Sequence, residues 1–363
     1  MNADIDHFSS TIRAAAESSL PLSIAGGGSK AFYGCPSTAQ AKKLDVTPYR
    51  GVVDYEPTEL VITARAGTPL VEIKSLLREN GQMLAFEPPH FSNASTLGGG
   101  IATGLSGPRR PYSGAVRDFM LGVRMLDGNG RDLHFGGQVM KNVAGYDVSR
   151  LMVGAMGTLG VLLEVSLKVL PLPAVERTLH LEMDESSAIA FMNRWAGKPL
   201  PISATGFTGN RLHIRLSGSE SAVCAAQKQL GGDAFSEGGI FWKSLRDQTH
   251  DFFKPAMSLW RLSIKSTTPP LSFPDLHARQ LIEWNGALRW LACDEECSGN
   301  ATANSIRQAA KSAGGHATLF RSQNQAALRF QPLDSGLMCI HQRLKQKFDP
   351  AGILNPGRLY PEF

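Results

Sequence analysis

The chain has 363 residues, of which 42% are hydrophobic, and its formal net charge is +5. This length predicts two domains of roughly 100–200 residues each. Basic residues form no stretch longer than the pairs Lys42-Lys43 and Arg109-Arg110, which argues against a nucleic-acid surface. The odd, dispersed set of five cysteines argues against a disulfide scaffold. No signal peptide or run of about 20 apolar residues is found, so we expect a cytoplasmic protein without a membrane span.

The first 173 residues alternate short strands with helices and glycine-rich loops. We predict a helix over 4–19, strands over 21–25, within 52–70 and over 83–89, and a helix over 70–81 closed by Gly81. A hairpin is predicted over 116–135, with its turn at 127–130, and a long strand over 161–169. Pro171 and Pro173 then interrupt the pattern, which predicts a domain boundary near residue 173.

The second half repeats a strand–helix–strand order. Strands are predicted over 211–218, 259–266, 287–293 and 316–321, and helices over 219–232 and 305–315. This order is typical of an antiparallel sheet backed by helices. A helix and an ordered turn segment follow over 333–360. We therefore expect an α+β protein with domains at 1–173 and 174–330 and a tail at 331–363.

Glycine is the informative excess, because many of the 37 glycines gather in three segments of the first 160 residues. Residues 25–30 follow a strand, and their backbone amides could bind a phosphate. A plain turn would explain the same residues. Residues 95–104 carry hydroxyls able to donate to an anion, but also suit a packed loop under a helix. Residues 154–161 precede a strong strand, where close helix–strand packing also favours small residues. Each segment alone leaves both interpretations open.

Taken together and in order, the segments resemble a known family. The sequence shows PLSIAGGGS, then Pro88 and STLGGGIAT, then Arg117-Asp118 with Leu121-Gly122, and GYDVSRLMVGAMGTLGV. These motifs resemble the FAD-binding domain of the vanillyl-alcohol oxidase / p-cresol methylhydroxylase (PCMH) superfamily, and FDPAGILNPGRL resembles the tail of its 2-hydroxy-acid branch. SGPRRPYSGAVRDFMLG and VMKNVAGYDVSRLMVGAMGTLG resemble the E-subunit family of bacterial glycolate oxidase (glycolate dehydrogenase) complexes.

The resemblance implies a two-subdomain PCMH-type FAD domain, a reduced ferredoxin-like cap and a tail returning to the FAD domain. It also implies which residues hold the cofactor. The implied FAD-binding residues are Gly26, Gly27, Gly28, Ser29, Pro88, Thr96, Leu97, Gly98, Gly99, Ala102, Thr103, Gly154, Gly157, Thr158, Gly160 and Val161. Arg109 or Arg110 would add positive charge, unless they form an exposed basic pair. The loop offers Ser29 and Lys30 where covalent members carry a histidine or cysteine, so we expect non-covalent FAD.

No catalytic residue or metal site is evident in the sequence. The nine histidines show no pair at metal-ligand spacing, and His213 and His316 are expected to be packed or exposed strand residues. His90, beside the second glycine segment, is the histidine to test first for a role near the cofactor. Cys293 and Cys297 are too few for an iron–sulfur cluster, which takes about four cysteines.

The expected function is that of an FAD subunit in a glycolate dehydrogenase complex acting on glycolate or D-lactate. The implied partners are a larger FAD-containing subunit, which performs the chemistry, and an iron–sulfur subunit that passes electrons to quinone; membrane attachment would be indirect. A self-sufficient FAD oxidase of another alcohol or hydroxy acid is the alternative. A scaffold that has lost flavin is a third, and the retained glycines argue against it if a ligand-free protein tolerates bulk there.

Overall fold

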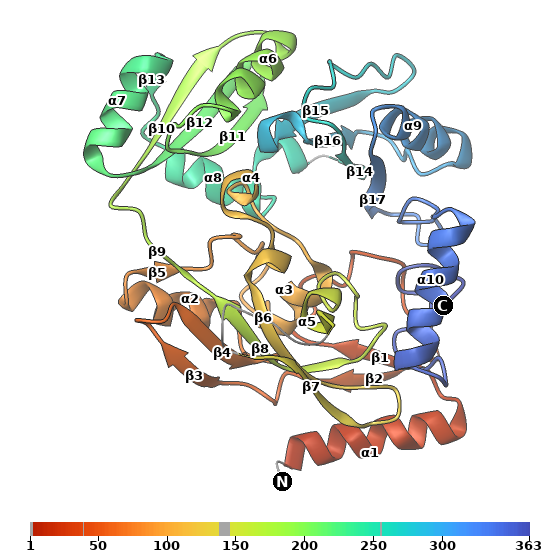
Figure 1. The fold of residues 1–363 in the computed structure, drawn as a ribbon. Coiled ribbons are helices and arrows are strands. Elements are labelled where there is room, and N and C mark those ends of the chain that lie inside the picture. Colours follow the sequence, from red (N-terminus) through yellow and green to blue (C-terminus); the bar gives the residue numbers. More distant parts are fainter. Residues whose placement is uncertain (1–2, 39, 138–145, 255) are drawn as a thin grey trace. The chain divides into compact units, whose positions relative to one another are not determined.

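The computed structural model describes residues 3–38, 40–137, 146–254 and 256–363, which form two compact units (Figure 1). The first unit comprises Met1–Leu105, Ala115–Pro171 and Pro332–Phe363, and the second comprises Ser106–Gly114 and Leu172–Gln331. Two short chain segments thus depart from a simple order along the sequence. The nine residues 106–114 belong with the second unit, which the sequence did not predict, and the C-terminal residues belong with the first.

A five-stranded antiparallel sheet lies at the centre of the first unit, with strand order β3-β4-β8-β6-β7. Two smaller strand pairs, β1-β2 and β5-β9, accompany it. The strands are β1 (Leu22–Ala25), β2 (Lys42–Asp45), β3 (Val52–Glu56), β4 (Val61–Arg65), β5 (Gln82–Met83), β6 (Met120–Leu126), β7 (Asp132–Gly136), β8 (Val161–Lys168) and β9 (Leu170–Pro171). The helices are α1 (Ala3–Ser18), α2 (Leu70–Glu79), α3 (Leu97–Thr103), α5 (Val148–Leu151) and α10 (Ser335–Phe348), with a 3-10 turn at Val116–Phe119.

Apolar spacing explains how the helices of this unit pack. In α1, Ile5, Phe8 and Ile12 recur every three or four residues and are all buried, as an amphipathic helix requires. They join Leu22 and Leu354 in one core cluster, whereas α2 and α3 pack into another. β8 is buried along nearly its whole length and contributes side chains to both clusters.

The predicted strand over 83–89 is wrong beyond Met83. Only Gln82 and Met83 pair with another strand, namely β9. Leu84 and Phe86 are apolar because they lie in the core, and Glu87 has a φ of +49°, which is incompatible with a continuing strand. The helix predicted over 70–81 ends at Glu79, and Gly81 takes the left-handed conformation one residue beyond the C-cap.

The second unit contains an eight-stranded antiparallel sheet, with strand order β13-β10-β12-β11-β15-β16-β14-β17. The expected type of sheet is confirmed, but β10, β11 and β15 were not predicted. The strands are β10 (Val175–Glu182), β11 (Ile202–Thr208), β12 (Arg211–Gly218), β13 (Asp233–Ala234), β14 (Ser258–Ser263), β15 (Ala278–Glu283), β16 (Leu288–Cys293) and β17 (His316–Ser322). The helices are α4 (Arg110–Ser113), α6 (Glu185–Ala196), α7 (Glu220–Leu230), α8 (Gly238–Arg246) and α9 (Asn300–Ser312), with 3-10 turns at Asp251–Phe253 and Trp284–Gly286.

The two faces of β12 differ in character. Leu212, Ile214 and Leu216 lie in a core cluster with side chains of α6 and α7. Since side chains alternate along a strand, His213 and Arg215 lie on the other face, and both are buried. The second unit therefore buries a histidine and an arginine on that face of β12.

Candidate functional site

A cleft of about 170 Å³ opens in the first unit where β1 ends. Four segments that are far apart in the sequence form its walls: the loop after β1, the α3 region, one residue of the third glycine segment, and the C-terminal tail. The lining residues are Ser23, Ile24, Ala25, Gly26, Gly27, Gly28, Ser29, Lys30, Ala31, Ser37, Thr96, Gly99, Ala102, Thr103, Met156, Asn355 and Arg358.

The loop after β1 presents open backbone donors to this cleft. Gly28 has a φ of +70°, and a Cβ atom there would meet nothing within 4 Å, so the backbone conformation alone requires glycine. Within the described part of the chain, the amides of Gly26, Gly27, Gly28 and Ser29 donate no hydrogen bond. Successive unpaired amides at the edge of a cleft form an anion-binding concavity. The loop therefore fits the diphosphate of a dinucleotide.

The second segment contributes a short helix to the opposite wall. Thr96 caps α3 by accepting a hydrogen bond from the amide of Gly99 at 3.3 Å. The hydroxyl of Thr103 donates to the carbonyl of Gly99 at 2.9 Å. The sequence predicted that this hydroxyl could donate to an anion, but in the structure its proton is used by the helix backbone. Ala102 completes this wall.

The remaining predicted residues of the second segment point into the protein. Pro88 and Leu97 are buried, and Leu97 belongs to the core of the first unit. A Cβ atom at Gly98 would come within 2.7 Å of the Cβ atom of Ala66. These three residues support the cleft from behind, and their direct contact with FAD remains a prediction.

The third segment meets the second through its backbone. The amide of Gly154 donates to the carbonyl of Ile101 at 3.0 Å, and that of Met156 donates to Ala102 at 2.9 Å. Met156 lines the cleft, although the sequence did not single it out.

The other predicted residues of this segment do not line the cleft. Thr158 and Val161 are 0% exposed, and the hydroxyl of Thr158 donates to the carbonyl of Ala155 at 2.7 Å. Gly157 lies against Asn355, and Gly160 lies against Met125. A cofactor role for these four residues and for Gly154 is still a prediction.

Several glycines are explained by packing within the chain itself. A Cβ atom at Gly27 would lie 1.5 Å from the carbonyl oxygen of Ala94, and one at Gly26 would lie 2.5 Å from Oγ1 of Thr96. One at Gly160 would lie 2.1 Å from the Cε atom of Met125. The expectation that a ligand-free protein would tolerate bulk at these positions is therefore wrong. Of the glycines that line the cleft, Gly28 would carry a Cβ atom that meets nothing within 4 Å, and Gly99 one that lies 3.2 Å from Oγ1 of Thr96.

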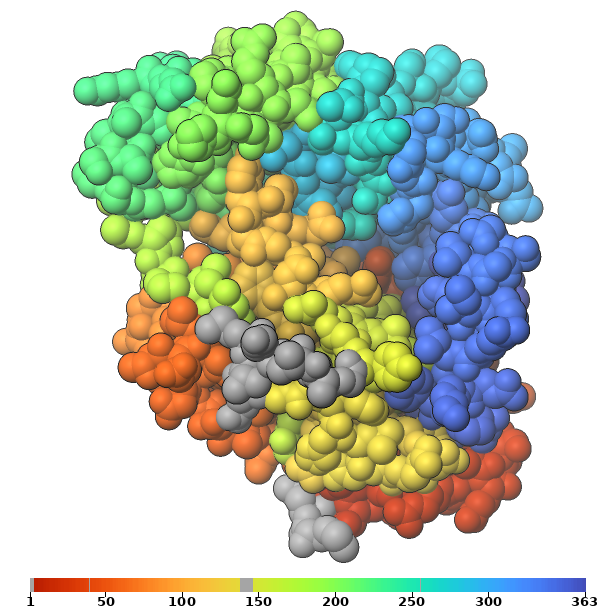
Figure 2. Space-filling model, viewed as in Figure 1, coloured from red at the N-terminus to blue at the C-terminus, as the bar shows by residue number. Residues whose placement is uncertain are grey.

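The C-terminal tail ties the three glycine segments together. Asn355 accepts a hydrogen bond from the amide of Ile24 at 2.7 Å through Oδ1, and donates to the carbonyl of Met156 at 2.6 Å through Nδ2. Its backbone amide donates to the carbonyl of Leu22 at 3.0 Å. Figure 2 shows the dark-blue tail residues against the yellow β6–β7 hairpin, where the amide of Gly128 donates to Phe348. The sequence shows the NPG motif of this tail, but it predicts no site residue there.

Two cations line the cleft, and the sequence singled out neither as a charge for FAD. Lys30 is 6% exposed, and its ammonium group lies 2.5 Å from the hydroxyl of Ser95. Arg358 donates to the carbonyls of Ala31 at 2.9 Å and Tyr33 at 2.7 Å. Both come from segments already in the cleft wall.

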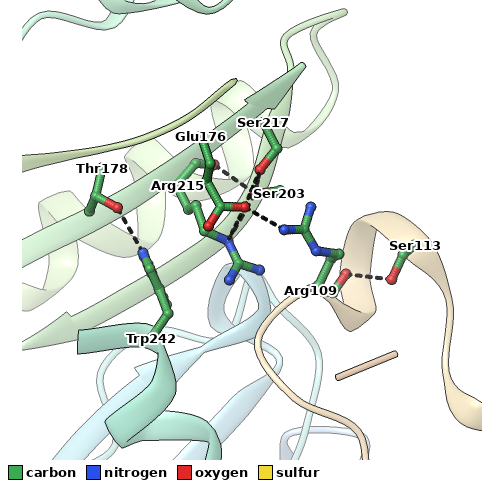
Figure 3. Close-up of polar contacts among 8 residues, drawn as sticks. All are labelled: Arg109, Ser113, Glu176, Thr178, Ser203, Arg215, Ser217 and Trp242. Atoms are coloured by element: carbon green, nitrogen blue, oxygen red, sulfur yellow. Dashed lines mark hydrogen bonds and ion pairs between the residues drawn. The ribbon is translucent and has the colours of Figure 1, made fainter. Parts of the chain in front are cut away.

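The expected cations, Arg109 and Arg110, lie in the second unit and serve its own structure. Arg109 donates to the carboxylate of Glu176 at 2.6 Å, and Arg110 lies 4.4 Å from the ring centroid of Trp284. Arg109 is buried and Arg110 is exposed, and neither residue lines the cleft. Figure 3 shows the carboxylate of Glu176 between the guanidinium groups of Arg109 and Arg215. Both arginines are buried, and Arg215 also donates to the hydroxyl of Ser203 at 3.0 Å.

Replacing Glu176 by glutamine removes the negative charge between these two arginines. We expect the second unit to lose about 1–3 kcal/mol, below the usual value for a broken buried pair because Glu176 is 36% exposed. Unfolding can be followed by tryptophan fluorescence, since Arg215 lies 5.3 Å from the ring of Trp242. Glu182→Gln is the matched control on the same strand, because its partner Arg211 is exposed. Equal losses in the two variants would contradict the assigned role of Glu176.

Two histidines that are distant in sequence meet in the second unit. His180 on β10 is the register partner of His213 on β12, and their ring centroids are 6.2 Å apart. His213 packs 4.1 Å from the ring of Phe241, and burial lowers the pKa of His213 to about 4. It is therefore a packed, neutral histidine, as expected. The spacing in sequence gave no sign of the pair, because only strand pairing brings the rings together.

None of the remaining candidate residues lines the cleft. His90 is half-buried and is not among the residues lining the cleft. Cys293 and Cys297 are free and buried, and burial raises the pKa of both thiols. Among the described residues, no three histidine, cysteine or acidic side chains are grouped as a metal site would require. In the same residues, no helix has the length and apolar character needed to cross a membrane.

Comparison with known proteins supports FAD as the cofactor. The family model described as an FAD binding domain matches residues 2–136. The solved structure of an alkyldihydroxyacetonephosphate synthase has a TM-score of 0.66 and 16% identity, over 96% of this chain and 74% of that one. This likeness shows that the fold is shared.

Sequence relatives define the family more narrowly. The glycolate oxidase subunit GlcD of Bacillus subtilis strain 168 is 30% identical over 48% of this chain and 37% of that protein. A D-lactate dehydrogenase of Anaerostipes hadrus is 25% identical over 46% of this chain and 35% of that protein. The glycolate oxidase subunit GlcE of Escherichia coli strain K12 is 51% identical over 94% of this chain and 93% of that protein. The chain therefore belongs to the glycolate oxidase subunit GlcE family of FAD-binding proteins.

Proposed function

We propose that this chain is the FAD-binding GlcE-type subunit of a glycolate dehydrogenase complex that oxidises glycolate, or D-lactate, to the 2-oxo acid. The observation that carries the proposal is the 51% identity to GlcE over nearly the whole chain, and the cleft lined by the first glycine loop supports it. In the complex, a larger FAD-containing subunit performs the oxidation, and an iron–sulfur subunit passes electrons to quinone. Location in the cytoplasm, with contact to the membrane only through the partners, completes the proposal.

The cleft fits FAD by the chemistry of its donors. The amides of residues 26–29 would hold the diphosphate, with Lys30 and Arg358 adjoining, and Thr96, Gly99, Ala102 and Thr103 would form the facing wall. Bound FAD would supply the hydride acceptor for oxidation of a hydroxyl-bearing carbon. The protein contributes the cradle, which excludes water and keeps the cofactor in one orientation.

The chain assists or relays electrons in this proposal and is not the main catalytic subunit. Oxidation of a 2-hydroxy acid needs a base for the hydroxyl proton and a cation for the carboxylate. The residues lining the cleft include no histidine and no carboxylate. The buried His213 is surrounded by aromatic rings and stays neutral, so it also makes a poor candidate for a base.

Purification of the chain alone and with its co-expressed partners tests the proposal. We expect flavin in the lone chain, and glycolate-dependent dye reduction only in the assembled complex. Dye reduction by the lone chain would establish the self-sufficient oxidase instead. A lone chain without flavin absorbance, even after incubation with FAD, would remove the cofactor assignment.

We further propose that the FAD is not covalently attached. The residues lining the cleft include no cysteine, histidine or tyrosine, the side chains able to bond the flavin or its ring methyl group. Acid precipitation of the holoprotein should release the yellow colour into the supernatant, where its absorbance is measured. Colour that stays with the precipitate would show a covalent bond.

A further inference from the structure

Building on the proposed function, we infer that Lys30 and Arg358 form a cationic pair that neutralises the FAD diphosphate. A diphosphate carries two negative charges, whereas backbone amides offer only partial positive charges. The residues lining the cleft include two full cations, and no carboxylate lies among them. One cation comes from the first glycine loop and the other from the C-terminal tail. The two ends of the chain thus bind the same group.

Hydroxyl groups hold Lys30 beside the glycine loop. Its ammonium group lies 2.5 Å from the hydroxyl of Ser95, which is itself 1% exposed, and 3.5 Å from the hydroxyl of Ser29. The ring centroid of Phe91 is 5.6 Å from the same ammonium group. Ser29 is one of the four loop residues with open amides, so this contact places the ammonium group next to the donors that would hold the diphosphate. An anion bound in the cleft would therefore lie close to a lysine whose burial costs hydration.

Arg358 combines its charge with a positioning role. Its guanidinium group donates to the carbonyls of Ala31, Tyr33 and Cys35. These carbonyls belong to the turn that follows the glycine loop, so Arg358 fixes the path of that loop from a position more than 300 residues later. Because Arg358 and Lys30 both line the cleft, a diphosphate bound there would lie beside two cationic residues.

The test compares ligands with and without the diphosphate. The full chain, stripped of flavin, is titrated with FAD and with riboflavin, and binding is followed by quenching of flavin fluorescence. In Lys30→Met, which keeps length and apolar packing, the Kd for FAD should rise about 10- to 100-fold. The Kd for riboflavin, which has no phosphate, should not change. Lys43→Met is the control, because Lys43 is an exposed lysine of the same unit whose partner is Asp45.

Salt dependence gives a second readout that a purely structural role would not affect. Raising the ionic strength should weaken FAD binding in the wild-type chain and weaken it less in Lys30→Met. Lys30→Arg, which keeps the charge, should retain most of the affinity and guards against loss by misfolding. Arg358→Lys should fall between wild type and Arg358→Met, because it keeps the charge but loses the fork that binds three carbonyls.

The outcomes separate this inference from the proposed function. Unchanged FAD affinity in Lys30→Met, or equal losses for FAD and riboflavin, would overturn the cationic pair while leaving FAD binding intact. An equal salt dependence in wild type and Lys30→Met would do the same. Failure of the wild-type chain to bind FAD would instead overturn the proposed function.

Discussion

Lys345→Met should destabilise the first unit by about 3–5 kcal/mol, the usual cost of removing one partner from a buried ion pair. Lys345 is 5% exposed and Asp349 is 1% exposed, and their charged atoms are 2.7 Å apart. The ammonium group also donates to the carbonyls of Thr158 at 2.9 Å and Leu354 at 2.6 Å. Its loss therefore leaves a carboxylate and two carbonyls without this partner. In calorimetry, the transition of this unit should fall by roughly 6–20 °C.

Two further variants separate charge from shape in this prediction. Lys347→Met, at an exposed position of the same helix, should change stability by less than about 0.5 kcal/mol. The double variant Lys345→Met/Asp349→Asn removes both charges, while asparagine retains an oxygen for the amides of Ile353 and Leu354. It should be more stable than the single variant. A double variant that is as unstable as Lys345→Met would refute the charge argument.

The same substitution should also weaken FAD binding in the proposed site. Asp349 and Lys345 fix the turn that leads to Leu354, and Asn355 follows directly with contacts to Ile24 and Met156. A tail that detaches would take Asn355 and Arg358 out of the cleft wall. Stability and cofactor affinity are therefore linked through this segment, although no residue of the helix α10 itself lines the cleft.

The sequence predicts regular elements better than it predicts the cleft. Strong periodicity identified α1, α2 and β8, because α1 and α2 each bury one face in a core cluster and β8 buries both faces, one in each cluster. The apolar run 83–89 misled, since Phe86 is buried as part of a turn and not of a strand. An apolar run in the sequence indicates that its side chains are buried. It does not reveal which backbone groups form hydrogen bonds with another strand.

Within the candidate site, the glycine segments predicted the loop after β1 and the α3 region as walls of the cleft, but they predicted neither Met156 nor the C-terminal tail. The side chain of Asn355 accepts a hydrogen bond from the amide of Ile24, 331 positions earlier in the chain. Nothing in the sequence around either residue indicates that contact. The same holds for Arg109, which looked like a phosphate ligand beside the glycine segment. Its chain leaves the first unit after Leu105, and its charge is matched by Glu176 on β10. A charged residue close to a motif in sequence need not lie close to it in space, because the chain can pass into another unit between the two.

The structure also shows that several of the glycines are not by themselves a sign of cofactor binding. Gly26, Gly27 and Gly160 would be retained by a protein with this fold whether or not it bound a cofactor, because side chains there would strike its own atoms. Support for FAD binding therefore comes from Gly28, where a Cβ atom would meet nothing within 4 Å, from the open amides of the loop, and from the cations Lys30 and Arg358 in the cleft wall.

Acid should weaken the second unit through His213 by about 3 kcal/mol between pH 6.5 and pH 4. Burial lowers the pKa of His213 from 6.5 to about 4, and the neighbouring His180, His250 and Arg211 act in the same direction. The folded protein thus keeps this histidine neutral while the unfolded chain takes up a proton below pH 6.5. Falling pH then favours unfolding throughout that interval, and the loss is complete near pH 4, where both states are protonated.

His213→Phe isolates this contribution, because the side chain is enclosed by the rings of Phe235 and Phe241, and a non-titrating ring keeps the packing. The variant should lose less stability than wild type when urea unfolding at pH 7 is compared with that at pH 5. A residual dependence should remain from His250, whose pKa is also lowered by burial. His134→Gln, at an exposed position of β7 in the first unit, should reproduce the wild-type profile. If His213→Phe and wild type lose equal stability on acidification, proton uptake by His213 is not the cause. The neutral ring would then be a packing element only, and the polar face of β12 would owe its acid response to other groups.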